Sequence, residues 1–262
     1  WGSFDLFVRG RAKKFSRVVQ EELVRGVSQA EPDVLVVTGD LTSQSLPQEF
    51  EAFRRIYEPL FERQDTVILP GNHDTYTRPT AGGVRADHYL QPWIGGGTYP
   101  RVRVIGEVAF VSICCSRPGF YARGLCPDDQ LERLDVLLES GELAGKTVLL
   151  LMHYATRRWD GTPFDTYTQC LANANALEAV LTTHVGSIDA ILHGHLHHGY
   201  RTELTTSAGV IPILNPGTSG YAWSPKSNRT AHFNVMELSG RDFTVERYFF
   251  DGEQGRFRLE EG

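Results

Sequence analysis

The stretch Thr66-Val67-Ile68-Leu69-Pro70-Gly71-Asn72-His73-Asp74 determines how the rest of this sequence is interpreted. Its first four residues form an apolar, largely β-branched run, which is typical of a strand buried on both faces. Gly71 permits a tight turn at which the backbone can approach a ligand closely. The turn then carries an amide, an imidazole and a carboxylate. These polar groups are therefore predicted at the carboxyl end of a buried strand, where open α/β sheets bind their ligands.

Three other apolar runs in the chain also end in polar residues. Gly39-Asp40 follows residues 33–38, His153 follows residues 147–152, and Gly194-His195-Leu196-His197 follows residues 187–192. The two histidines of the last motif alternate around a leucine, so in an extended segment both would face one side. Because the carboxyl ends of parallel strands meet at one edge of a sheet, we expect all these groups to gather there. Carboxylate, amide and imidazole are the ligand types of a divalent metal site.

Each of these motifs taken singly has an ordinary structural explanation. Asp40 alone is typical of a turn or helix-capping residue, and residues 72–74 alone fit a plain turn. A lone His153 at a strand end is more often a core histidine whose hydrogen bonds are satisfied. The metal-site interpretation rests on the joint order of the motifs, each directly after a predicted buried strand.

Helical and strand-like segments alternate over the first two thirds of the chain. Helices are predicted around residues 13–29, 50–57, 127–138 and 176–183, and strands at residues 33–38, 66–69, 107–113, 147–152 and 187–192. Between residues 199 and 258, aromatic-rich segments separated by Pro, Gly and Asn predict mostly antiparallel strands. We therefore expect an α/β fold with a sheet at its centre, in one layered domain.

Composition excludes several classes of protein. The chain has 262 residues, 41% hydrophobic and 22% charged, which excludes a disordered chain. The net charge of −6 argues against a general nucleic-acid binder. No apolar run approaches the ~20 residues that span a bilayer. Four irregularly spaced cysteines fit reduced thiols better than a disulfide framework, so we expect a cytoplasmic protein. Its oligomeric state is left open.

The ordered motifs resemble those of the calcineurin-like metallophosphoesterase superfamily. Four of the five superfamily motifs are matched, by Gly39-Asp40, Gly71-Asn72-His73-Asp74, His153 and Gly194-His195-Leu196-His197. The resemblance covers about residues 13–200 and implies a four-layer α/β/β/α sandwich. A single metallophosphoesterase domain would then span residues 1–262, with the metal-site motifs in residues 39–197 and a β-rich part at residues 199–258.

The resemblance also implies roles for individual residues around two divalent metal ions, for which Mn, Fe or Zn would suit. Asp40 would bridge the ions, Asn72, His153 and His195 would complete the shell of one, and His197 would bind the other. His73 would be the catalytic residue beside the metals. Some phosphatases of the superfamily pair this histidine with an aspartate three residues after the Gly-Asp motif. Because Ser43 occupies that position, we do not expect such a dyad here.

The fifth motif, Asp-x-His before Gly39-Asp40, is missing. Asp5-Leu6-Phe7 carries phenylalanine where an imidazole is needed, and no strand is predicted before the first helix. Trp1-Gly2-Ser3 is similar to the residues that follow this motif in the superfamily, and no initiating Met is present. We therefore expect the natural protein to have a short upstream segment that ends in Asp-x-His.

The expected function is metal-dependent hydrolysis of a small phosphate ester, with a phosphodiester favoured, by attack of a metal-bridging hydroxide. The Gly-Asn-His-Asp motif and the chain length resemble the bacterial phosphodiesterase-type members. Phosphomonoesterase activity and a non-catalytic binding scaffold of the same fold are alternatives. A nuclease is a further alternative, because a basic cluster lies near the start of the chain, at Arg9, Arg11, Lys13, Lys14 and Arg17. His193 and His198 could contact substrate, and residues 215–219 are expected to form a loop at the rim of the site.

Overall fold

The computed structural model describes residues 14–76, 84–119 and 121–260. Expectations about Trp1-Gly2-Ser3, Asp5-Leu6-Phe7 and the basic residues Arg9, Arg11 and Lys13 concern residues outside this part of the chain. Within it, no helix is both long enough and apolar enough to cross a bilayer.

Five α-helices and eleven strands in the described residues form the framework. The helices are α2 (Arg17–Ala30), α3 (Pro47–Phe61), α4 (Val84–Ile94), α5 (Asp128–Glu139) and α6 (Ala174–Thr183). The strands are β1 (Val34–Val37), β2 (Asp65–Ile68), β3 (Arg101–Ile105), β4 (Val108–Ser112), β5 (Thr147–Leu151), β6 (Ala190–Leu192), β7 (Tyr200–Thr206), β8 (Gly209–Asn215), β9 (His232–Ser239), β10 (Asp242–Asp251) and β11 (Arg256–Leu259). Three short 3₁₀ turns, η2 (His73–Thr75), η4 (Val185–Ser187) and η5 (Pro225–Ser227), complete the described elements.

Local sequence explains where the main helices begin. The hydroxyl of Ser16 accepts a hydrogen bond from the amide of Val19 and caps α2. Helix α3 begins at Pro47, whose missing N–H costs nothing at a first helical position. Helix α5 carries Asp128 and Asp129 in its first turn, where negative charge is stabilised by the helix dipole.

The strands form three sheets. The largest has six strands in the order β3-β4-β5-β6-β8-β7, with β4, β5, β6 and β8 parallel and the two edge strands antiparallel. Strands β1 and β2 form a parallel pair, and β9, β10 and β11 form an antiparallel sheet. Sequence reasoning thus placed the antiparallel C-terminal strands correctly, whereas α4 and β3 were not predicted.

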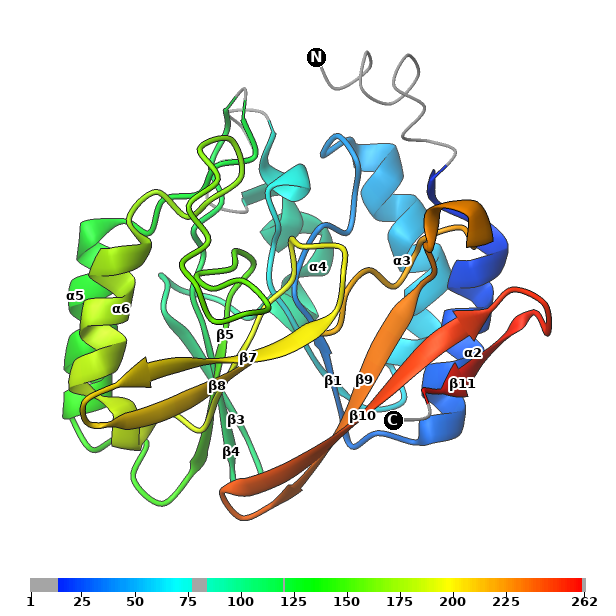
Figure 1. Cartoon of the computed structure of the whole chain (residues 1–262). Helices are drawn as coiled ribbons and strands as arrows, with labels where there is room; N and C mark the ends of the chain where they lie inside the picture. Colours follow the sequence, from blue (N-terminus) through cyan, green and yellow to red (C-terminus); the bar gives the residue numbers. More distant parts are fainter. Residues whose placement is uncertain (1–13, 77–83, 120, 261–262) are drawn as a thin grey trace.

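Successive side chains of the central strands point to opposite faces of their sheet, and both faces are covered, which produces four layers. Helices α5 and α6 form one outer layer, and α2 and α3 form the other (Figure 1). In β5, Val148 and Leu150 pack against α5 and α6, whereas Leu149 and Leu151 face the core between the sheets. On the other side of the molecule, Ile68 of β2 packs against apolar residues of α2, α3 and α4. The expected four-layer α/β/β/α sandwich is confirmed.

Candidate metal centre

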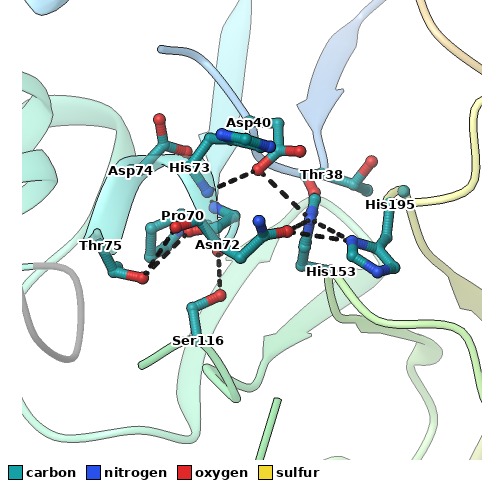
Figure 2. A network of polar contacts seen from close by, with 12 residues as sticks. Thr38, Asp40, Pro70, Asn72, His73, Asp74, Thr75, Ser116, His153 and His195 are labelled. Carbon is teal, nitrogen blue, oxygen red and sulfur yellow. Dashed lines mark hydrogen bonds and ion pairs between the residues drawn. The ribbon is translucent and has the colours of Figure 1, made fainter. Parts of the chain in front are cut away.

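Side chains from four distant segments meet at the carboxyl ends of the parallel strands (Figure 2). Asp40 follows β1, Asn72 follows β2, His153 follows β5 and His195 follows β6. Among the described residues, Asp40, His153 and His195 form a group whose candidate ligand atoms lie within 4.8 Å of one another. The prediction that these groups gather at one edge of the fold is confirmed for these three residues and for Asn72, which contacts both histidines.

Backbone carbonyls fix the orientation of both imidazoles. Nδ1 of His153 lies 2.7 Å from the carbonyl oxygen of Thr38, and Nε2 of His195 lies 2.9 Å from that of Gln169. Because a carbonyl oxygen can only accept, each of these nitrogens must carry the proton. In the neutral ring the other nitrogen then presents a lone pair, and in both residues that nitrogen points into the group.

The converging atoms are closely spaced acceptors. Nε2 of His153 is 3.1 Å from Oδ1 of Asn72 and 3.4 Å from Oδ1 of Asp40. Nδ1 of His195 is 3.0 Å from the same Asn72 oxygen and 3.2 Å from Nε2 of His153. Such a cluster of lone pairs repels itself unless a cation or proton lies among its members. Its two nitrogens, one amide oxygen and one carboxylate oxygen fit a divalent ion such as Mn, Fe or Zn.

Burial and charge keep the group ready to bind a cation. Burial lowers the pKa of His195 to about 3, with a smaller effect from His153, so the ring is neutral at pH 7. Burial alone would raise the pKa of Asp40, but the nearby imidazoles of His153, His73 and His195 hold it below its ordinary value. An ionised carboxylate beside the neutral ring of His195 is the protonation state that metal binding requires.

The two glycines that precede Asp40 and Asn72 make this close approach possible. Gly39 has a φ of +97°, and a Cβ there would lie 2.5 Å from the backbone nitrogen of Gly71. A Cβ on Gly71 would lie 2.2 Å from Oδ1 of Asp40. Asp40 and His195 themselves have left-handed backbones, with φ of 60° and 66°. Such conformations are unfavourable outside glycine and concentrate at functional sites.

Asp74 joins the loops after β1 and β2. Its buried carboxylate accepts hydrogen bonds from the amides of Gly71, Leu41 and Thr42 and from the Thr42 hydroxyl. Burial and the nearby Asp40 carboxylate raise the pKa of Asp74 to about 6, although these hydrogen bonds act in the opposite direction. The fourth residue of the Gly-Asn-His-Asp motif therefore has a positioning role.

His73 lies beside the group rather than among its acceptor atoms. Its backbone amide donates to Oδ1 of Asp40 across 3.0 Å, and its Nδ1 lies 2.9 Å from the carbonyl oxygen of Ser43. The side-chain dyad was not expected because residue 43 is serine, and here the backbone of Ser43 provides the acceptor. Nε2 of His73 is 3.2 Å from the hydroxyl of Tyr76.

The ring of His197 is not part of the acceptor group found among the described residues. Its Nδ1 forms a short hydrogen bond with the hydroxyl of Tyr221, and the two rings meet edge to face. Tyr221 is 8% exposed, its ring is tilted by 50° against that of Phe15, and the guanidinium of Arg229 lies 5.4 Å from its ring centre. Tyr221 lies outside the motifs, and nothing in its sequence context pointed to this contact.

The remaining sequence candidates flank the group. His193 is 1% exposed, so it is a core residue rather than a substrate contact. His198 lines a separate cavity of about 640 Å³ beside the C-terminal sheet, together with His232 and Arg247. Asn215, in the expected rim loop, donates to the carbonyl oxygens of Leu196 and His198 and so supports the histidine-bearing loop.

Comparison with known proteins places this geometry in a family context. A family model described as calcineurin-like phosphoesterase matches residues 8–199. A protein from Vesicomyosocius okutanii subsp. Calyptogena okutanii (strain HA), described as a probable cyclic nucleotide phosphodiesterase, is 25% identical over 199 residues, covering 76% of each chain.

Solved structures share the fold at low sequence identity. A dimetal phosphatase from Danio rerio is 17% identical with a TM-score of 0.59, covering 88% of this chain and 90% of that one. A purple acid phosphatase from yellow lupin (Lupinus luteus) seeds is 12% identical with a TM-score of 0.62, covering 92% of this chain and 48% of that one. The family model spans most of the chain and includes every residue of the acceptor group. The chain therefore belongs to the calcineurin-like phosphoesterase family.

Proposed function

We propose that this chain is a metal-dependent phosphodiesterase. Asp40, Asn72, His153 and His195 would hold one divalent ion, and Asp40 and His197 would contribute to the shell of a second. The observation that carries this proposal is the convergence of four acceptor atoms, in which neighbouring pairs lie 3.0–3.4 Å apart. On the opposite side of each imidazole, a backbone carbonyl oxygen accepts the ring proton. A hydrogen-bonded core cluster would instead alternate donors and acceptors.

The chain's own residues prepare the site for phosphoryl transfer. Bound divalent ions supply an activated hydroxide and neutralise charge on the phosphoryl oxygens. The amide of His73 orients the Asp40 carboxylate, and the Ser43 carbonyl turns Nε2 of His73 away from the backbone. From that position the imidazole can hold a proton at Nε2 and deliver it to the leaving oxygen, or stabilise charge that develops there.

Two observations favour a diester over a monoester. The 25% identical relative is described as a probable cyclic nucleotide phosphodiesterase. The Gly71-Asn72-His73-Asp74 motif and the chain length resemble phosphodiesterase-type members more than protein phosphatases. Phosphomonoesterase, nuclease and non-catalytic scaffold functions are the competing hypotheses for the same fold.

A substrate panel separates these hypotheses. We expect the Mn-loaded protein to hydrolyse bis-p-nitrophenyl phosphate faster than p-nitrophenyl phosphate, and the His153→Ala variant to lose both the activity and tight Mn binding. His184→Ala is the matched control, because that histidine bonds Asp135 away from the site. A preference for the monoester would favour a phosphomonoesterase, and cleavage of single-stranded DNA would favour a nuclease. Metal binding without any hydrolysis would favour the scaffold.

A further inference from the structure

Two tyrosines expose their rings on loops that border the candidate metal centre. Tyr121 is 55% exposed and Tyr167 is 65% exposed. Their rings meet edge to face, with centroids 5.9 Å apart. The guanidinium of Arg123 lies 4.9 Å from the centre of the Tyr167 ring. We call these three residues the aromatic platform.

Backbone hydrogen bonds hold the two loops of the platform together. The amide of Gly124 donates to the carbonyl of Cys170, and the amide of Ala172 donates to the carbonyl of Gly124. Tyr167 itself lies in a turn closed by the bond from the Cys170 amide to the Thr166 carbonyl. The platform is thus assembled from two anchored segments rather than from independent surface side chains.

Both loops of the platform also contact the site through His195. The turn that carries Tyr167 presents the Gln169 carbonyl, which accepts the Nε2 proton of His195 at 2.9 Å. At most about 7 Å of extended backbone separates Gln169 from Tyr167. On the other loop, Gly124 packs closely against the ring of Tyr154. A Cβ added to Gly124 would lie 2.6 Å from a carbon of that ring. The ring of Tyr154 in turn lies 4.7 Å from that of His195.

The chemistry of the platform suits a planar, electron-rich ring. Exposed tyrosine faces stack on aromatic ligands, and a guanidinium can lie over a π system or donate to ring acceptors. The Nε atom of Arg123 is buried, so the surface that the platform offers to a ligand consists mainly of the exposed rings of Tyr121 and Tyr167.

We propose that the aromatic platform binds the base of a nucleotidyl phosphodiester while the phosphate lies at Asp40, Asn72, His153 and His195. This inference rests on the proposed function and specifies its substrate class. The base stacks against Tyr167 and Tyr121, beside the guanidinium of Arg123. The site thereby selects diesters that carry a nucleobase over aliphatic diesters of similar charge.

An equilibrium binding measurement tests the platform separately from catalysis. Isothermal titration of the Mn-loaded protein compares AMP with ribose 5-phosphate, which carries the same phosphate and sugar without a base. We expect AMP to bind more tightly by about five- to 150-fold, the usual range for stacking on one aromatic side chain. Tyr167→Ala should bring this affinity ratio close to one, whereas Tyr167→Phe, which keeps the ring, should preserve it.

Each outcome decides the inference. Equal affinities for AMP and ribose 5-phosphate, failure of both to bind, or a ratio unaffected by Tyr167→Ala and by Tyr121→Ala would overturn it. Hydrolysis of diesters, together with equal affinities for AMP and ribose 5-phosphate, would support the proposed function and contradict base binding at the platform. Tighter binding of AMP than of ribose 5-phosphate without any hydrolysis would support the platform as a nucleotide site and contradict the proposed activity.

Discussion

The Nδ1 atom of His73 donates to the backbone carbonyl oxygen of Ser43 across 2.9 Å. This bond assigns the ring proton to Nδ1, so Nε2, which lies 3.2 Å from the Tyr76 hydroxyl, is the atom for proton transfer. His73→Asn should therefore lower the turnover number by about 10²- to 10⁴-fold, the range for loss of a general acid. Because the side chain is not among the acceptor atoms of the group, metal content should change little. Steady-state kinetics and elemental analysis of the same preparation check both expectations.

The Ser43 carbonyl remains when the Ser43 side chain is removed, so Ser43→Ala is a suitable control and should retain most of the turnover. An His73→Asn variant with wild-type turnover would remove this residue from the mechanism. Equal loss of metal and activity would assign it a structural role instead.

Gly71→Ala tests the close approach of the two loops. The added Cβ would lie 2.2 Å from Oδ1 and 2.3 Å from the backbone nitrogen of Asp40, so the loops must separate. We expect a loss of about 1–3 kcal/mol in the free energy of unfolding, together with weaker Mn binding. Gly186→Ala is the matched control, since a Cβ there meets nothing within 4 Å. Urea unfolding and Mn titration report the two effects, and similar results for both variants would refute the steric argument.

Tyr221→Phe tests whether the Tyr221 hydroxyl positions His197. The substitution keeps the ring that packs near Phe15 but removes the hydrogen bond to Nδ1 of His197. Outer partners of metal-binding histidines typically contribute about 10- to 100-fold in affinity, so we expect one class of Mn site to weaken by that amount. Calorimetric titration with Mn measures this affinity. Unchanged affinity at every site would mean that His197 does not hold metal through this arrangement.

His232 should make the protein less stable in acid. Burial, assisted by Arg247 and His198, lowers the pKa of His232 to about 4 from an ordinary value of 6.5. Between these two pH values the unfolded chain binds the proton and the folded chain does not, so the free energy of unfolding falls as the pH falls. His232→Gln removes this contribution and should flatten the profile between pH 6.5 and 4. Parallel urea-midpoint profiles for variant and wild type would contradict the prediction.

Much of the site could be predicted because its residues follow apolar runs at the ends of parallel strands. Asp40, Asn72, His153 and His195 are each marked by this pattern, and the structure brings them together. The order of the motifs also indicated the four-layer fold. Hydrophobic periodicity was sufficient for these elements because each buries one clear face or is buried on both.

Other parts of the molecule had no such signal. Helix α4 contains Pro92 and a non-helical backbone at Leu90, so its periodicity is interrupted. The acceptors that orient the imidazoles are backbone carbonyls, of Thr38 and Gln169, and a backbone atom is independent of residue type. Tyr221 reaches His197 only through the tertiary fold, because it lies 24 residues further along the chain. The assignment of His197 to a second metal therefore stays a prediction.

The left-handed backbones at Asp40 and His195 place functional side chains in the site at a cost in folding stability. Glycine or asparagine adopts this conformation at lower cost than histidine, and glycine does so more readily than aspartate. A library selected for thermal tolerance alone should therefore enrich these small residues at positions 40 and 195, and its most heat-resistant members should be inert. In directed evolution, these two positions would have to be held fixed while stability is improved elsewhere.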